Sequence, residues 1–188
     1  MNNRILPSPP QTTLFVSRET SNCPLISEII QLGHHIQQQG VSEEETGVLS
    51  MDYAKRLLIN AKNSDIKKMT QQDIVEIVDY DPLKNILMVI GPKDPALETP
   101  VHWIIQKARQ DVNVLVQINS IRLYEQWKKT LPTTEKETPP ASLERAKEIL
   151  KTLRNGKTIL LKNEGILFVG FNSKEMYNSL HTYLGEQK

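Results

Sequence analysis

The sequence predicts a single α/β domain in which helices pack on a mostly antiparallel sheet. Its 188 residues are enough for one domain with a hydrophobic core and are short for two. Strand-like segments come mostly in consecutive groups, with amphipathic helices between the groups. Consecutive strands pair readily as antiparallel hairpins, whereas strict alternation of strands and helices predicts a parallel sheet. We therefore place one domain over residues 21–188, after a loose N-terminal arm over residues 1–20.

Composition narrows the classes of protein to be considered. The net charge is +1 with acids and bases interspersed, so no nucleic-acid-binding surface is predicted. No apolar run reaches the roughly 18–20 residues that a membrane span requires. Three prolines interrupt the first ten residues, so we expect no signal peptide. A single cysteine, Cys23, excludes an intramolecular disulfide and favours a reducing, cytoplasmic setting.

The first half of the chain predicts a short strand, a helix and two pairs of strands. The strand lies in the arm at Thr13–Ser17, and Ser21 or Asn22 is the expected cap of a helix that ends at Gly40. Thr70 with Asp73 has the spacing of a capping box. The apolar stripe of the helix is Leu25, Ile29, Leu32 and Ile36. The paired strands are expected at Val48–Met51, Arg56–Asn60, Ile74–Asp79 and Ile86–Ile90.

A helix and a strand between Glu98 and Asn119 form the centre of the predicted fold. Thr99 is a plausible N-cap, and Pro100 is tolerated at the first helical position. The strand over residues 112–119 alternates apolar and polar side chains towards its end. Because side chains two positions apart share a face of a strand, Gln117 and Asn119 project together.

The last part of the chain predicts three helices around a pair of strands. The first helix covers Ile121–Lys129, and the second begins at Ser142, with an apolar face of Leu143, Ala146, Leu150 and Leu153. Strands are expected at Thr158–Leu161 and Ile166–Val169. Ser173 is the expected cap of the C-terminal helix.

The order of these elements and their local sequence motifs resemble those of the class II aldolase/adducin family, over about residues 25–185. The segments similar to typical motifs of the family are GHHIQQQG at 33–40, ETGVLS at 45–50, LINAKN at 58–63, TQQDIVEIVD at 70–79, ALETPVH at 96–102, DVNVLVQIN at 111–119, PPASLERAKEIL at 139–150 and ILLKNEGILFVG at 159–170. The resemblance implies a three-layer α/β/α sandwich around a mostly antiparallel sheet. It also implies a homo-oligomer, often a tetramer.

The resemblance places a metal site where this chain has changed. Enzymes of the family hold zinc with the two His of an H-x-H strand end and the His of N-H-G, which correspond to Gln117, Asn119 and Glu164. The family's acid/base Glu corresponds to Glu98. Zinc in enzymes prefers imidazole or thiolate ligands, whereas amide oxygens suit hard cations better. We therefore expect no zinc at these positions.

The phosphate-binding pattern of the family is also incomplete. Gly47 and Ser50 match it, whereas Val48, Lys62 and Asn63 stand where the family has Asn and Ser-Gly. Losing the metal ligands and the phosphate loop together favours loss of the reaction over a change of substrate.

Two hypotheses follow for the function. The first is a non-catalytic, oligomeric binding or scaffold protein, as the adducin head resembles the enzymes without sharing their activity. The second is a divergent Mg²⁺- or Mn²⁺-dependent lyase or aldolase, with Glu98, Gln117, Asn119 and Glu164 as metal ligands and Lys62 attracting a small anionic, sugar-phosphate-like substrate. These residues can also be explained without function, as polar residues at a strand end, an acid in a tight turn and a carboxylate near a helix N-terminus.

Overall fold

The structure, a computed structural model, describes residues 11–185 and contains one eight-stranded sheet in the order β1-β5-β4-β3-β2-β6-β8-β7. The strands are β1 (Thr12–Ser17), β2 (Thr46–Tyr53), β3 (Arg56–Asn60), β4 (Ile74–Asp81), β5 (Ile86–Ile90), β6 (Val114–Asn119), β7 (Thr158–Leu161) and β8 (Gly165–Gly170). The helices are α1 (Ile26–Gln38), α2 (Thr99–Ala108), α3 (Ile121–Trp127), α4 (Leu143–Leu153) and α5 (Ser173–Leu184), with a short 3₁₀ turn at Gln71–Asp73. No helix within residues 11–185 is long and apolar enough to cross a membrane.

Strand pairing confirms a mostly antiparallel α/β fold. Every neighbouring pair in the sheet is antiparallel except β1 with β5. The short strand expected at Thr13–Ser17 is present as β1 over Thr12–Ser17, a parallel edge strand with Thr12 opposite Ile86. Residues 1–10 of the predicted arm lie outside the described residues.

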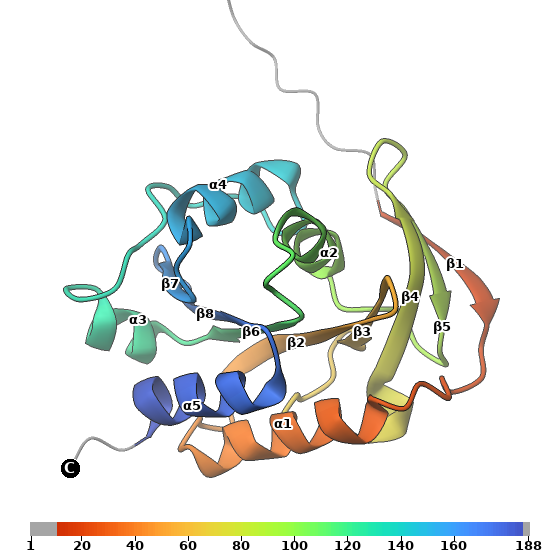
Figure 1. Ribbon diagram of the computed structural model, residues 1–188, viewed down its shortest axis with the longest axis horizontal. Coiled ribbons are helices and arrows are strands. Elements are labelled where there is room, and N and C mark those ends of the chain that lie inside the picture. Colours follow the sequence, from red (N-terminus) through yellow and green to blue (C-terminus); the bar gives the residue numbers. More distant parts are fainter. Residues whose placement is uncertain (1–10, 186–188) are drawn as a thin grey trace, which may run out of the picture.

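Helices cover both faces of the sheet, with α1 and α5 on one side and α2 and α4 on the other (Figure 1). Side chains alternate along β6, so successive residues of this strand pack against opposite helix layers. Val116 and Ile118 pack in the core cluster that contains the buried residues of α1 and α5. Leu115 packs in the second cluster, with buried residues of α2 and α4. Gln117 and Asn119 share the parity of Leu115, so the strand directs them to the α2/α4 side.

Thr99 and Ser173 are not the helix caps that the sequence predicted. Glu98 rather than Thr99 is the N-cap of α2, and the Thr99 hydroxyl instead donates to the carbonyl of Ala96 at 2.6 Å. Asn172 rather than Ser173 caps α5, accepting from the Glu175 N–H at 2.9 Å.

The remaining predicted caps are confirmed at two places and wrong at one. Ser142 caps α4 as expected, accepting from the Arg145 N–H at 3.0 Å. The capping box of Thr70 and Asp73 is also present. The cap predicted at Ser21 or Asn22 is wrong: α1 begins at Ile26, and the Ser21 hydroxyl donates to Glu76 instead.

The buried face of α4 is rotated from the predicted one. Leu143, expected in the apolar face, is 52% exposed. The buried residues of this helix are Arg145, Ala146, Glu148, Ile149 and Leu153. The sheet elements also differ at their ends: β6 begins at Val114 rather than residue 112, and β2 extends over Thr46–Tyr53. Because this face of α4 is buried in place of the predicted one, Arg145 is buried as well.

Candidate functional site

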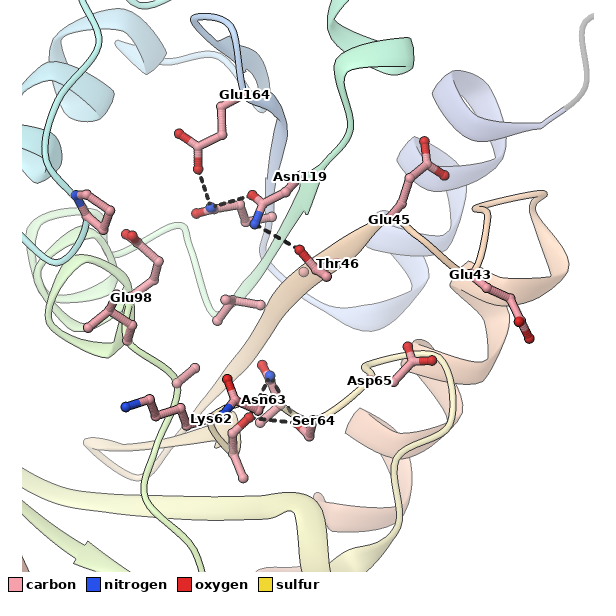
Figure 2. Close-up of a pocket in the computed structure, with 18 residues that line it drawn as sticks. Glu43, Glu45, Thr46, Lys62, Asn63, Ser64, Asp65, Glu98, Asn119 and Glu164 are labelled. Atoms are coloured by element: carbon pink, nitrogen blue, oxygen red, sulfur yellow. Dashed lines mark hydrogen bonds between the residues drawn. The ribbon is translucent and has the colours of Figure 1, made fainter.

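A pocket of about 470 Å³ opens where several segments of the chain meet (Figure 2). Its walls come from the residues before and at the start of β2, the loop after β3, the segment that leads into α2, and the end of β6 with the turn between β7 and β8. Glu98, Asn119 and Glu164 project into this region from three different segments (Figure 2). The pocket is therefore built from residues far apart in the sequence.

Most residues predicted from the sequence meet in this pocket. Its lining includes the four candidate ligand positions and four of the phosphate-loop positions: Glu98, Gln117, Asn119, Glu164, Gly47, Val48, Lys62 and Asn63. Ser50 is the exception, because it is fully buried and is hydrogen bonded to His102, with 2.8 Å between its Oγ and Nδ1 of the ring.

The three positions that the resemblance aligns with metal-binding histidines are connected through Gln117. The Gln117 amide nitrogen donates to Asn119 Oδ1 at 2.9 Å and to Glu164 Oε1 at 3.1 Å. The Asn119 amide in turn donates to Thr46 Oγ1 at 3.3 Å, and these bonds are dashed lines in Figure 2. The side chains that would face a metal ion are thus engaged with each other.

Arg145 of α4 links the carboxylates of Glu98 and Glu164. Its Nη2 donates to Glu164 Oε1 at 2.5 Å, and its Nε lies 3.0 Å from Glu98 Oε2, an ion pair in which the N–H is not aligned for a hydrogen bond. The Arg145 side chain is only 4% exposed. The Arg145 guanidinium therefore lies between Glu98 and Glu164, the two carboxylates among the candidate metal ligands.

The sequence does not single out Arg145, because the predicted apolar face of α4 runs through Leu143 and Leu150. A face drawn through Ala146, Ile149 and Leu153 follows the same helical spacing and places Arg145 at its edge. An arginine beside such a face is a signal for a buried ion pair, since a buried charge needs a partner.

Burial and the charges around Glu98 act on its pKa in opposite directions. Burial raises the pKa of the Glu98 carboxyl, Arg145 lowers it and the nearby Glu164 raises it, and the net shift is upward. For Arg145, burial lowers the pKa, but the interactions with Glu164 and Glu98 outweigh it and the net shift is upward. Arg145 therefore remains the charged centre of this cluster.

The layer below the pocket contains a neutral histidine. His102 is fully buried on α2, and burial, with a smaller effect of Arg145, lowers its pKa to about 3. Its Nδ1 is paired with Ser50, while Nε2 has no partner within residues 11–185. This imidazole is not among the residues that line the pocket.

The acidic wall of the pocket is held by a buried lysine. Lys67 donates to the carbonyls of Ser42, Glu43 and Glu45 at 2.6, 3.3 and 2.7 Å. Its side chain is 2% exposed. These bonds attach the loop before β2 to the loop after β3, so the two walls of the pocket are fixed relative to each other.

The structure thus combines a helix-covered, mostly antiparallel sheet with a pocket at the end of β6. The sequence profile described as "Class II Aldolase and Adducin N-terminal domain" matches residues 27–124, just over half of the chain. The protein therefore belongs to the class II aldolase/adducin family. No match was found among curated protein sequences.

Solved structures share the fold at low sequence identity. An L-fuculose 1-phosphate aldolase is similar with a TM-score of 0.71 and 18% identity, covering 86% of this chain and 82% of the aldolase. A sugar-phosphate aldolase from Thermotoga maritima gives 0.68 and 17%, covering 84% and 89%. The L-fuculose-1-phosphate aldolase from Thermus thermophilus gives 0.65 and 20%, covering 85% and 88%. At these identities the likeness shows the fold alone.

The side chains present do not fit the zinc that the family implies. Zinc needs imidazole, thiolate or carboxylate ligands, and the three histidine positions hold two amides and one carboxylate. That carboxylate, on Glu164, is bonded to Arg145 and Gln117. Within residues 11–185, no three or more His, Cys, Asp or Glu side chains converge as a metal-binding group.

Proposed function

We propose that this protein is a non-catalytic class II aldolase-type domain that serves as a binding or scaffold protein. The observation that carries the proposal is Arg145, whose guanidinium pairs with both Glu98 and Glu164. A divalent cation entering between these carboxylates would have to displace a buried positive charge. Two cations a few ångströms apart in a poorly solvated layer repel each other strongly.

A Lewis acid is central to the aldol chemistry of the family. In metal-dependent aldol cleavage, the ion stabilises the enediolate by several kcal/mol. Arg145 cannot replace that contribution, because it is nearly inaccessible and its charge already faces two carboxylates. Glu98, the position of the acid/base, is itself held in this ion pair.

Self-association and a cytoplasmic location complete the proposal. The family resemblance supports a homo-oligomer, with a tetramer as the expected form, and the single cysteine supports a reducing compartment. Light scattering coupled to size exclusion measures the oligomeric state directly. A monomer at micromolar concentration would contradict the scaffold part of the proposal.

The second candidate is a Mg²⁺- or Mn²⁺-dependent lyase at Glu98, Gln117, Asn119 and Glu164. One observation favours it: Gln117 Oε1 is buried and has no hydrogen-bond partner within residues 11–185, so an oxygen ligand is free. It requires Arg145 to swing away from both carboxylates when the ion binds.

Elemental analysis and an activity assay on one preparation separate the two candidates. We expect protein purified without chelators to contain no stoichiometric zinc, manganese or magnesium, and to leave L-fuculose 1-phosphate uncleaved. A stoichiometric metal together with cleavage would refute the non-catalytic function.

A reconstruction tests the physical reason for the expected lack of metal. One variant carries Gln117→His, Asn119→His and Glu164→His, and a second adds Arg145→Ala. We expect the second variant to bind zinc at least about tenfold more tightly than the first, a difference of about 1.4 kcal/mol. Equal zinc affinity would show that Arg145 does not oppose the ion.

A further inference from the structure

Strand β1 is an edge of the sheet, and no strand within residues 11–185 pairs with its outer side (Figure 1). On its inner side, the Thr12 N–H donates to Asn85 O at 2.9 Å. Because backbone groups alternate between the two sides of a strand, the N–H and C=O groups of Thr13 and Phe15 point outward. The outer side of β1 therefore presents main-chain donors and acceptors that another strand can use.

The opposite edge of the sheet, at β7, is covered by the chain itself. A segment before α4 runs beside this strand, with a parallel bridge between Thr133 and Leu160. The Leu160 N–H donates to Pro132 O at 2.8 Å, and the Thr134 N–H donates to Leu160 O at 3.0 Å. Of the two edges, β1 is thus the one that residues 11–185 leave open.

Strand β1 also lacks the sequence features that usually prevent edge-to-edge pairing. Such edges are typically interrupted by lysine, proline or inward-pointing charges. Residues 11–17 contain no charged side chain and no proline. The irregularity in the pairing of β1 with β5 lies between Phe15 and Ser17, so residues 12–15 keep an unbroken register. This four-residue stretch is regular enough to accept a second strand.

An exposed apolar patch adjoins the open edge. It consists of Leu14 and Val16 of β1 and Met88 of β5, which are 49, 55 and 39% exposed. Leu14 and Met88 are neighbours in the strand register, on the face opposite Phe15. Phe15 packs against the core cluster that includes Trp103 of α2. The cluster formed with α1 and α5 contains no residue of β1 or β5, so these two helices leave the patch uncovered.

We propose that β1 is an interaction surface for a second copy of this chain, whose β1 pairs with it in antiparallel orientation about a two-fold axis. The outward groups define the register: Thr13 lies opposite Phe15 of the second copy, and Phe15 opposite its Thr13. These two pairs form four main-chain hydrogen bonds. Leu14 then faces its own counterpart across the axis, in a pair without hydrogen bonds, where opposing side chains approach most closely.

The charge distribution is compatible with this pairing. The first charged residue after β1 is Arg18, and its Cζ lies 3.7 Å from the centre of the Phe15 ring, on the face away from Leu14. The two-fold axis places the Arg18 residues of the two copies at opposite ends of the paired strands, about 27 Å apart at 3.4 Å per residue. No like charges meet, and the patches of Leu14, Val16 and Met88 join into one apolar surface. The contact goes beyond the proposed function, because it does not involve the pocket.

A cysteine cross-link tests the register directly. Leu14→Cys, in a Cys23→Ser background, should form a disulfide-linked dimer with oxidised glutathione, since opposing Cα atoms of such a pair lie within the reach of a disulfide. The matched control is Met88→Cys on the same face. Positions 88 of the two copies are separated by three strand spacings, about 14 Å, so this variant should not cross-link. No dimer with Leu14→Cys, or equal dimer with both variants, overturns the proposal.

Light scattering over a concentration series measures the contact without a cross-link. Leu14→Lys opposes two like charges across the axis and should lower the mass of the assembly at least about twofold. The control is Leu83→Lys, at a position 90% exposed in the turn between β4 and β5, which should leave the mass unchanged. An oligomer unaffected by Leu14→Lys refutes this contact alone. A wild-type monomer at every concentration also refutes the self-association in the proposed function.

Amide hydrogen exchange distinguishes a second copy from a cover supplied by the chain itself. We expect the Thr13 and Phe15 amides of the wild type to lose at least about tenfold in protection when the protein is diluted until the assembly dissociates. Protection that is independent of concentration shows that the chain covers its own edge and overturns the proposal. Rapid exchange of both amides at every concentration overturns it as well.

Discussion

Replacing Arg145 by methionine should reveal how strongly the buried charge cluster depends on its single cation. Methionine keeps an unbranched side chain but removes the charge and every hydrogen bond of the guanidinium. Glu98, with 8% of its side chain exposed, then remains buried without a positive partner, whereas Glu164, with 32% exposed, can turn towards water. The Glu98 carboxylate therefore loses its counter-charge while it stays buried, whereas water can partly solvate the Glu164 carboxylate.

The magnitude follows from this asymmetry. Removing one member of a buried ion pair typically costs about 3–5 kcal/mol, mostly from the charge left behind. Because Glu164 can rehydrate, we expect the lower end of that range, about 3 kcal/mol, in the free energy of unfolding. Adding Glu98→Gln should recover at least about 1 kcal/mol, since the stranded charge is then gone.

Urea denaturation followed by circular dichroism is the appropriate assay. Guanidinium chloride is unsuitable as the denaturant because its cation resembles the missing group. At low millimolar concentration, however, the same ion should raise the melting temperature of Arg145→Met and leave the wild type unchanged.

The matched control is Lys151→Met on the same helix. Lys151 pairs with Glu135 at 2.6 Å, but both side chains are well exposed, so we expect a change within about 1 kcal/mol. If Arg145→Met costs no more than Lys151→Met, or if Glu98→Gln brings no recovery in the Arg145→Met background, the cluster does not act as described.

Three further predictions concern the layers around the pocket. His102 should make folding sensitive to acid: its pKa is lowered from 6.5 to about 3, so its contribution is complete above pH 6.5 and falls as the pH drops, by about 2 kcal/mol at pH 5 in urea melts. Lys67→Met should destabilise by about 2–4 kcal/mol and speed amide exchange in the loop before β2, because three carbonyls lose their ammonium partner. Gly165→Ala should cost about 2–3 kcal/mol in urea unfolding, because a Cβ there would overlap the Ile118 carbonyl oxygen.

Each of these predictions has an internal comparison. His102→Gln should remove the extra loss of stability between pH 7 and pH 5, and an unchanged pH profile would contradict the assignment. Lys68→Met, next in the chain but exposed, should stay within about 1 kcal/mol. Gly170→Ala lies at the other end of β8, where a Cβ meets nothing closer than 3.6 Å, and should be nearly neutral. Equal effects of the two glycine substitutions would rule out the steric explanation.

The strand that carries the candidate ligand positions was predictable because its pattern has a period of two. Val116 and Ile118 had to be buried together, which forced Gln117 and Asn119 onto the opposite face. The structure shows these two amides hydrogen bonded to each other. Local alternation was sufficient here, since the pairing of β6 with β2 and β8 buries its apolar face in a fixed register.

The charge cluster was not predictable in the same way. On α4, two apolar faces that share Ala146 and Leu153 compete: one adds Leu143 and Leu150, and the other adds Ile149. Only the packing of α4 against α2 and the sheet selects the second face, and that choice buries Arg145. Which carboxylates receive the guanidinium depends on residues 98 and 164, far away in the chain, so no local pattern could indicate it.

The partner of the N-terminal strand β1 could not be predicted from the sequence either. The short strand expected near residues 13–17 is present, but its partner is β5, about seventy residues later, and the two strands run parallel. A turn sequence indicates a hairpin, whereas a long-range parallel partner leaves no local signal. The strand itself was therefore predictable, and its place in the sheet was not.

The position of Arg145 also decides how this layer responds to the chemical environment of the cell. A metal ion bound at a site is in equilibrium with its free concentration, so chelators and starvation can empty the site and loosen the fold. The guanidinium of Arg145 is covalently part of α4, and its local concentration beside Glu98 and Glu164 is set by folding alone. The α2/α4 layer should consequently keep its structure at any level of metal supply.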